Sequence, residues 1–434
     1  MSKHSLLLLG LCIMVAVVIF LWSHGPNVAI FGGTSAGDNS SPDSPKPASD
    51  YNIVLITVDT LRADHLGCYG YQKGTSPNID RFAEESILFE KAYSPAPVTV
   101  PALRAMMTGR LVSNEDKEDL VSYYNQTPFL AQILREKGYR TAGFTDHHGL
   151  GGSDRKGELG ASHTHSLHKG FDTFENLGKS RKEITSDELS ERALEWMGQN
   201  HGARFFLWIH YFDPHYNFRA SSEHEGLFGF STVSSGRIYN GIDIMDIRKI
   251  VHSLSPSEIK SIIALYDSEI FFTDKHIGKV LDRVKVLGLD RSTVIVVAAD
   301  HGEEFKERTR IGHERTIYNE LIHVPLIVKI PGEKPRRIRS TVTTTRIFDF
   351  LSGPGAPSIE SLKNGGPAVS RTFHYYKDDR VEPNDFAIIS GSYKYVLNPG
   401  TRKEELYNVS NDDLEMFNPD FPYSTGAFET DLIV

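Results

Sequence analysis

Runs of apolar, often β-branched residues alternate along the chain with segments that have the mixed polar and apolar pattern of helices. The first run, residues 52–58, contains no charged residue, which is typical of a strand buried on both faces of a parallel sheet. Strands that alternate with helices in this way predict an α/β domain with a mainly parallel sheet. The other expected strands lie within residues 139–145, 204–215, 292–305 and 323–332, and the expected helices lie near residues 76–86, 100–108, 127–138, 185–198 and 256–287.

Two of the expected helices have start signals of the same kind. Ser76 precedes Pro77, and Thr127 precedes Pro128, so that a hydroxyl residue is placed to cap a helix whose first residue is proline. Gly138 is expected to end the second of these helices.

The pattern changes past about residue 350. Short apolar runs with turn signals between them, such as FAIISGSYKYVLN and EELYNV, predict antiparallel strands. We therefore expect a catalytic domain over residues 51–350 and a small antiparallel C-terminal subdomain over residues 351–434.

The N-terminal segment differs in character from the rest. Residues 6–22 are apolar and uncharged, and a Ser/Pro/Gly-rich stretch follows them. At about 1.5 Å per residue, this run nearly crosses a bilayer core of ~30 Å. We expect residues 1–24 to form a membrane anchor or uncleaved signal, with Lys3 on the cytoplasmic side, and residues 25–50 to form a flexible linker. The folded part would then lie outside the cytoplasm, in the periplasm or the extracellular space.

The charge balance limits the class of partner. The formal net charge is −9, and an acidic chain lacks the basic face that nucleic-acid binding requires. We expect no nucleic-acid partner. The two cysteines are Cys12 and Cys68, and because Cys12 lies in the N-terminal apolar run, no disulfide is expected within the folded part.

Groups able to bind a metal or act as a nucleophile follow several expected strands. Asp59 ends the first strand, two histidines lie within residues 210–215, and Asp300 and His301 follow another strand. Ligands of open α/β sheets bind at these carboxyl ends. A divalent cation could bind the carboxylate oxygens of Asp59 and Asp300 together with a ring nitrogen of His301. Such a cation would activate Thr99, which is expected at a helix N-terminus, as a nucleophile. Each of these residues singly is commonly a turn or cap residue, and only their shared placement indicates a site.

A set of motifs covers nearly all of residues 51–410. They are, in order, NIVLITVDTLRADHLGCYGY, TSPNIDRFAEES, PVTVPALRAMMTGR, HYFDPH, YDSEIFFTDKHIGKVLDRVKVLGL, DHGEEF, GHERTIYNELIHVPLIV, and GSYKYVLN followed by EELYNV. The chain therefore resembles the sulfatases of the alkaline-phosphatase superfamily. The resemblance implies an alkaline-phosphatase-like three-layer α/β/α fold, with a mainly parallel central sheet and a small antiparallel C-terminal subdomain. It also implies a divalent metal at the active site and a covalent sulfo- or phospho-enzyme intermediate.

Thr99 stands at the position of the family nucleophile. Counted back from the T-G-R of residues 108–110, it aligns with the cysteine of the family pattern C-x-P-S-R. Sulfatases oxidise that cysteine to formylglycine, an aldehyde that threonine cannot form. Relatives with threonine here, such as phosphonate monoester hydrolases and the phosphotransferases of lipid and teichoic acid assembly, use the hydroxyl directly. The resemblance implies Asp59, Asp300, His301 and Thr99 as ligands of one divalent metal, with Mn²⁺ or Zn²⁺ favoured and Ca²⁺ as the further option.

The resemblance also assigns residues around the ester. His215 and His313 are expected to act as catalytic residues at the leaving oxygen, since a histidine pKa near neutrality suits proton transfer. Arg104, His148 and His210 are expected to bind the substrate, which would be a small-molecule or a glycan- or lipid-linked anionic ester.

Three positions depart from the family pattern and keep two alternatives open. Thr60 replaces the second aspartate of the usual pair, Asp146 replaces a lysine, and Leu103 stands where the motif has arginine, with Arg104 one residue late. One step along a helix turns a side chain by about 100°. The alternatives to a hydrolase are a membrane-anchored phospho-head-group transferase and an inactive binding protein on a sulfatase scaffold.

Overall fold

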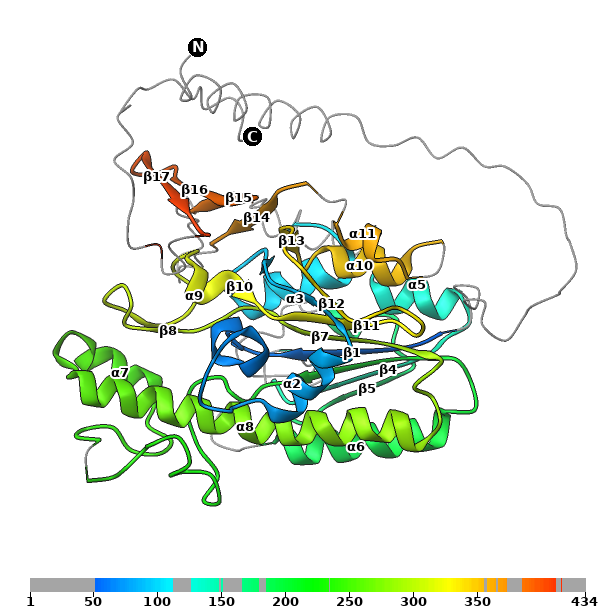
Figure 1. Cartoon of the computed structure of the whole chain (residues 1–434), viewed down its shortest axis with the longest axis horizontal. Helices are drawn as coiled ribbons and strands as arrows, with labels where there is room; N and C mark the ends of the chain where they lie inside the picture. The colour runs from blue at the N-terminus through cyan, green and yellow to red at the C-terminus, as the bar shows by residue number, and fades with distance from the viewer. Residues whose placement is uncertain are drawn as a thin grey trace, which may run out of the picture. The chain divides into compact units, whose positions relative to one another are not determined.

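A computed structural model gives the fold of the chain (Figure 1). It describes residues 51–111, 126–147, 150, 166–178, 185–233, 235–354, 357–363, 366–372, 385–410 and 415. Within these ranges, no helix combines the length and the apolar character that a bilayer span needs. The expected anchor, residues 1–24, and the expected linker, residues 25–50, lie outside the described residues.

An eight-stranded sheet lies at the centre of the described structure, in the order β12-β2-β11-β7-β1-β6-β4-β5. The five strands from β7 to β5 run parallel, whereas β11 is antiparallel to both of its neighbours. The expected mainly parallel sheet is therefore confirmed. Its strands are β1 (Asn52–Val58), β2 (Ile87–Phe89), β4 (Arg140–Thr145), β5 (Thr173–Asn176), β6 (Phe205–Tyr211), β7 (Thr293–Ala299), β11 (Leu326–Lys329) and β12 (Arg336–Ile338).

Helices cover both faces of this sheet. Successive residues of a strand point to opposite faces, so Val54 and Ile56 of β1 pack into one core, and Ile53 and Leu55 pack into the other. Figure 1 shows α2, α6 and α8 on one side of the sheet and α3, α5, α10 and α11 on the other. Their bounds are α2 (Pro77–Glu84), α3 (Thr99–Thr108), α5 (Leu130–Glu136), α6 (Ser186–Asn200), α8 (Pro256–Val286), α10 (Arg346–Ser352) and α11 (Ile359–Lys363).

A four-stranded antiparallel sheet follows at the C-terminal end, in the order β14-β15-β16-β17. Its buried residues form a third core with Leu321 and Ile322 of α9. The expected domain boundary at residue 350 falls inside α10, so we propose that the C-terminal subdomain begins at β14. These elements are α9 (Asn319–Ile322), β14 (Ala368–Arg371), β15 (Phe386–Ser390), β16 (Tyr393–Asn398) and β17 (Lys403–Asn408).

Short elements connect these layers. A three-stranded sheet has the order β10-β3-β13, and β8 pairs with β9 in a separate hairpin. The remaining elements are β3 (Ala92–Tyr93), β8 (Glu304–Phe305), β9 (Ile311–Gly312), β10 (His323–Val324), β13 (Val342–Thr343), α7 (Ile244–Ile250), and the 3₁₀ turns η2 (Ala63–His65), η3 (Gly67–Tyr69), η4 (Ser166–His168) and η5 (Val251–Ser253).

The start of α2 is capped from another helix. Ser76 occupies the N-cap position, but its hydroxyl makes no cap and donates to Asp80 (2.9 Å). Asp274 of α8 provides the acceptor instead: its carboxylate accepts the backbone N–H of Asn78 (3.0 Å) and of Ile79 (2.7 Å). A carboxylate at this position also interacts favourably with the helix dipole.

The start of α5 also differs from the expected one. The helix begins at Leu130, three residues after Thr127, and Phe129 is its N-cap residue. The side chain of Gln132 accepts the Phe129 N–H (2.9 Å). The helix ends at Glu136, and Gly138 follows with a positive φ, as expected for the end of a helix.

Replacing Asp274 with alanine should lower the free energy of unfolding by about 1–3 kcal/mol, because the first N–H groups of α2 lose their acceptor. Asp282→Ala, an exposed aspartate on the same helix, is the matched control and should change it by less than about 0.5 kcal/mol. Urea denaturation measures both variants. Equal midpoints for the two would mean that the cap contributes nothing.

Candidate active site

Two acidic residues leave the sheet at adjacent points. β1 and β7 pair in parallel, and Val58 lies opposite Ala299. Asp59 and Asp300, the next residues of the two strands, are therefore neighbours, and both are completely buried. His301 Nε2 lies 3.6 Å from Asp59 Oδ1 and 3.6 Å from Asp300 Oδ2. Strand pairing thus brings together three residues that are far apart in the sequence.

These three residues form a candidate cation site. One ligand atom from each lies within 4.8 Å of the other two. Asp59 Oδ1 and Asp300 Oδ2 are buried, and neither atom has a hydrogen-bond partner among the described residues. His301 Nδ1 donates to the Gly302 carbonyl (2.9 Å), which leaves the lone pair of Nε2 for a ligand. The unpaired acceptors fit a divalent cation with oxygen and nitrogen ligands.

The electrostatics of the two carboxylates support this interpretation. Burial, and then the charge of Asp300, raise the pKa of Asp59 well above its usual range. One oxygen of Asp300 accepts the backbone N–H of Thr60 (3.2 Å) and of His301 (2.7 Å), so the other oxygen remains for a ligand. A bound cation would offset the repulsion between the carboxylates.

Thr99 is the first residue of α3 and is 4% exposed. Its Oγ1 lies 3.2 Å from His301 Nε2 and 3.5 Å from Asp59 Oδ2. The N-terminus of a helix presents free N–H groups and a positive dipole, which favour an anion at this point. The hydroxyl therefore lies between the candidate cation site and a position suited to an anionic group.

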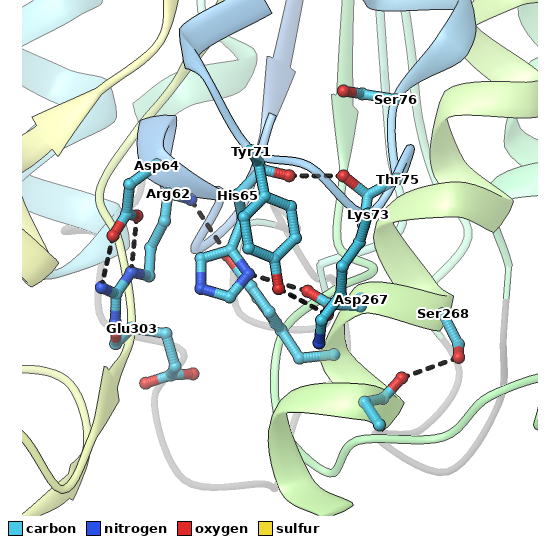
Figure 2. A network of polar contacts seen from close by, with 12 residues as sticks. Arg62, Asp64, His65, Tyr71, Lys73, Thr75, Ser76, Asp267, Ser268 and Glu303 are labelled. Carbon is cyan, nitrogen blue, oxygen red and sulfur yellow. Dashed lines mark hydrogen bonds and ion pairs between the residues drawn. The ribbon is translucent and has the colours of Figure 1, made fainter. Parts of the chain in front are cut away.

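The loop after β1 is held by a polar network (Figure 2). Thr60 has a φ of 52°, which is unfavourable for a β-branched residue, and its carbonyl accepts the Tyr266 hydroxyl (2.8 Å). Asp267, the next residue of α8, contacts His65 (2.7 Å) and Lys73 (2.9 Å). Contacts from α8 thus hold the loop that follows the first metal-site carboxylate.

His210 lies beside Asp59 within β6. Its Nε2 is 3.7 Å from Asp59 Oδ2, and its Nδ1 is 2.9 Å from Thr57 Oγ1, which accepts the indole N–H of Trp208 (3.0 Å). Burial lowers the pKa of His210 to about 4, so the ring is neutral at pH 7. Because the Thr57 hydroxyl oxygen accepts from Trp208, its hydrogen can be donated to Nδ1 of His210. Nδ1 is then the acceptor of the neutral ring, and the proton lies on Nε2, on the side of Asp59.

His313 is paired with a buried acid. Its Nδ1 lies 3.0 Å from Glu303 Oε1, and its ring centre lies 4.5 Å from that of His301. Burial is the main cause of two opposite shifts: the pKa of Glu303 is raised well above its usual range, and the pKa of His313 is lowered well below it. Burial thus disfavours a charge on either partner, and Nε2 of His313 is the ring nitrogen left for a substrate.

His215 lies next to His313, with ring centres 4.9 Å apart. Its Nδ1 donates to the Tyr216 carbonyl (2.6 Å), and its ring stacks on Phe212 at 4.4 Å. The backbone contact selects the tautomer and leaves Nε2 as the second ring nitrogen. The structure thus brings both expected catalytic histidines together beside the cation site.

His147 is a site residue that the sequence pattern did not single out. The alignment with the family selected His148, which lies outside the described residues. His147 Nε2 lies 3.7 Å from Asp59 Oδ2, and its ring makes an edge contact with Phe212 (5.0 Å). The sequence carries two adjacent histidines at this point, and the alignment selected only the second of them.

Arg104 is buried on α3, and burial together with the charge of Arg104 lowers the pKa of Lys169. Leu103 occupies the motif position and packs in the core. Substrate binding by Arg104 stays a prediction.

Asp146 connects elements around the site. One of its oxygens accepts the Phe212 N–H (2.7 Å), and the other accepts the Thr185 hydroxyl (2.6 Å). Burial and the nearby charge of Asp213 raise the pKa of Asp146 to about 8. It therefore ties the end of β4 to β6 and to the start of α6.

Comparison with known proteins agrees with this geometry. The family model described as Sulfatase matches residues 51–353. Human iduronate 2-sulfatase is 24% identical over 355 residues, 70% of this chain, but the match spans only 63% of the human protein's length. A Δ4,5-hexuronate-2-O-sulfatase from Bacteroides thetaiotaomicron is 21% identical, covering 85% of this chain and 84% of that protein.

A crystal structure of a phosphonate monoester hydrolase from Agrobacterium radiobacter has a TM-score of 0.67 to this structure. It is 17% identical, and the match covers 85% of this chain and 91% of the hydrolase. This likeness, together with the mainly parallel sheet and the antiparallel C-terminal sheet, confirms the expected alkaline-phosphatase-like fold. The chain belongs to the sulfatase family, whose members are hydrolases of ester bonds.

Proposed function

We propose that this chain is a metal-dependent hydrolase that transfers a sulfuryl or phosphoryl group from an anionic ester first to Thr99 and then to water. The observation that carries the proposal is the position of Thr99 Oγ1, at the N-terminus of α3 and within 3.5 Å of both His301 and Asp59. A hydroxyl beside cation ligands can be activated as a nucleophile, and the helix end favours the anionic group that it attacks.

Asp59, Asp300 and His301 would hold the metal, with Thr99 as a further oxygen ligand. The dependence of sulfatases on a metal supports this assignment. The nitrogen ligand favours Mn²⁺ or Zn²⁺ over Ca²⁺. When bound, the ion supplies positive charge that offsets the carboxylates, lowers the pKa of a coordinated hydroxyl and polarises the ester oxygens.

The reaction consists of two displacements. Thr99 Oγ1 forms a bond to sulfur or phosphorus while the bond to the ester's leaving oxygen breaks, and Asp59 Oδ2 is placed to accept the hydroxyl proton. The leaving oxygen takes a proton from His215 or His313. Water then attacks the same sulfur or phosphorus and gives a proton to the histidine that lost one, while the bond to Thr99 Oγ1 breaks. Asp59 returns its proton to Thr99, and the inorganic anion leaves.

Glu303 keeps His313 ready for this proton transfer. A neutral Glu303–His313 pair holds one proton between Oε1 and Nδ1, and an anionic ester near the ring would favour its protonated form. In His215 a backbone carbonyl accepts Nδ1–H, so Nε2 can give a proton only when the ring is protonated. Both rings thus present Nε2 as the atom that exchanges a proton with the substrate.

Threonine chemistry favours phosphorus among the two ester classes. Formylglycine enzymes expel sulfate from their covalent intermediate through the aldehyde, which Thr99 cannot provide. The covalent Thr99 intermediate must therefore be hydrolysed by attack of water at sulfur or phosphorus. Buried, unpaired carboxylate atoms of Asp59 and Asp300 favour a metalloenzyme over an inactive scaffold, since such atoms are costly without a ligand. An acceptor alcohol in place of water would make the same site a transferase.

The substrate that we propose is an ester on a glycan or a similar alcohol. The names of the two sulfatases described above, which refer to iduronate and hexuronate, support this class. We also propose that residues 1–24 anchor the enzyme outside the cytoplasm. The apolar run of residues 6–22 supports this second proposal.

Deleting residues 1–24 should move the protein from the membrane fraction to the soluble fraction with the fold intact. The physical reason is that the apolar run is expected to contribute to membrane insertion and not to the core. Fractionation and circular dichroism measure both effects. A truncated protein that is unfolded would contradict the anchor proposal.

Thr99→Ala should reduce kcat by about a thousandfold or more on aryl phosphate, phosphonate and sulfate esters, because the covalent step is lost. Thr99→Ser keeps the hydroxyl and should retain partial activity. Mass spectrometry of a quenched wild-type reaction should find the phosphoryl or sulfuryl group on the peptide that contains Thr99. Near-normal turnover in Thr99→Ala would falsify the covalent mechanism.

The matched control is Thr108→Ala, at the other end of the same helix. Thr108 is also buried, and its hydroxyl donates only to the Arg104 carbonyl (2.7 Å). This variant should lose about 1 kcal/mol of stability and keep its kcat.

Asp59→Ala and Asp300→Ala should each remove the bound metal, because each deletes one of the few anionic ligands. Elemental analysis after dialysis measures the metal content, and EDTA should lower the melting temperature of the wild type but not of either variant. Asp274→Ala removes a buried carboxylate from the α2 cap and should keep the metal. Full metal content in both site variants would rule out the assigned ligands.

A further inference from the structure

Arg248 lies on α7, in the segment between β6 and α8. Its Nε donates to the Ile311 carbonyl (3.3 Å), and its guanidinium carbon lies 5.7 Å from the ring centre of Tyr216. A β-carbon on Gly312 would lie 2.5 Å from Nη2. The space for this guanidinium therefore exists because the residue before His313 has no side chain.

Within the described part of the chain, no carboxylate forms an ion pair with Arg248, and its only hydrogen bond comes from Nε. Glu303 is the acid that its charge affects: Arg248 lowers the pKa of this buried carboxyl, against the larger opposite effect of burial. The side chain is half-buried, so the charge is only partly hydrated. Arginine usually binds a carboxylate, sulfate or phosphate through the paired N–H groups of its fork, and here that fork is available.

A series of contacts places Arg248 relative to the nucleophile. Thr99 contacts His301, the His301 ring lies beside His313, and the His313 ring stacks on Tyr216 with centres 5.0 Å apart. Arg248 lies over Tyr216, at the end of this series. The pKa of His313 is lowered mainly by burial and then by His301 and His215. The charge of Arg248 is close enough to lower it further. Arg248 therefore lies over Tyr216, next to the histidines proposed to protonate the leaving oxygen.

We propose that Arg248 binds an anionic group on the leaving alcohol of the substrate. The inference rests on the proposed function, because the leaving oxygen is defined by Thr99 and the histidines. It assigns the substrate class: an ester of an acidic alcohol, such as a sugar that carries a carboxylate, or a second sulfate or phosphate, close to the ester carbon. The metal and the end of α3 would hold the transferred group itself, which leaves Arg248 for a charge on the alcohol.

Selectivity between two synthetic esters tests this role. One substrate is a 4-nitrophenyl ester, and the other is its 3-carboxy derivative, each as the phosphate and as the sulfate. The wild type should have the higher kcat/KM for the carboxylated ester. In Arg248→Gln the ratio of the two kcat/KM values should fall about 10- to 100-fold, mainly through KM, since a charge-assisted pair is lost. Arg248→Lys should give an intermediate ratio.

A second arm does not depend on turnover. Calorimetry compares the binding of the two leaving alcohols, 5-hydroxy-2-nitrobenzoate and 4-nitrophenol, to the metal-loaded wild type and to Arg248→Gln. The wild type should bind the carboxylated alcohol more tightly, and the variant should lose that preference. A doubly sulfated sugar in place of the benzoate tells whether a sulfate is preferred to a carboxylate.

Lys249→Gln is the matched control, because Lys249 is the next residue of α7, exposed and paired with Asp246 (2.8 Å). It should leave the ratio unchanged. A ratio in Arg248→Gln within about twofold of the wild type, or equal losses on both esters, would mean that Arg248 only supports β9 and would overturn the proposal. If the wild type turns over neither ester, the hydrolase proposal fails, and the binding arm alone decides the role of Arg248.

Discussion

Asp59 and Asp300 are buried side by side because the parallel strands β1 and β7 end at the same edge of the sheet. Two carboxylates without a compensating charge are costly in such a place, and the raised pKa of Asp59 reflects that cost. The surrounding structure reduces the cost only in part, since backbone N–H groups satisfy one oxygen of Asp300. A cation would neutralise the remaining oxygens, and the proposed role of Thr99 depends on such a cation.

Three histidines around Asp59 and Asp300 are each oriented by a contact through Nδ1. His301 and His215 each donate Nδ1–H to a backbone carbonyl, and His313 is paired through Nδ1 with Glu303. In each ring the partner of Nδ1 determines which nitrogen faces the site. The backbone partners hold their rings without adding charge, whereas Glu303 adds a second titratable group. This difference makes His313 the ring whose protonation responds most directly to an anionic substrate.

The helix starts show how far local signals extend. The proline after Ser76 correctly indicated the first residue of α2, but the hydroxyl donates to Asp80, and the cap comes from Asp274. Either a local hydroxyl or a distant carboxylate can accept the first N–H groups of α2, and the carboxylate is the stronger acceptor. Only packing of α8 against α2 brings that carboxylate within reach. The shift of α5 to Leu130 has a local cause instead, because Gln132 of the same helix accepts the N–H of Phe129 at its start.

The sequence alone determined the alternation of strands and helices, the carboxylates at the strand ends and the threonine at the nucleophile position. These features depend on residue type and spacing, which a pattern contains. Only the tertiary structure decided that His147 faces Asp59, and that Arg248 of α7 lies over Tyr216, whose ring stacks on His313. Such contacts depend on side-chain direction and on the packing of segments distant in the chain, where one residue's shift in register turns a group into the site or away from it.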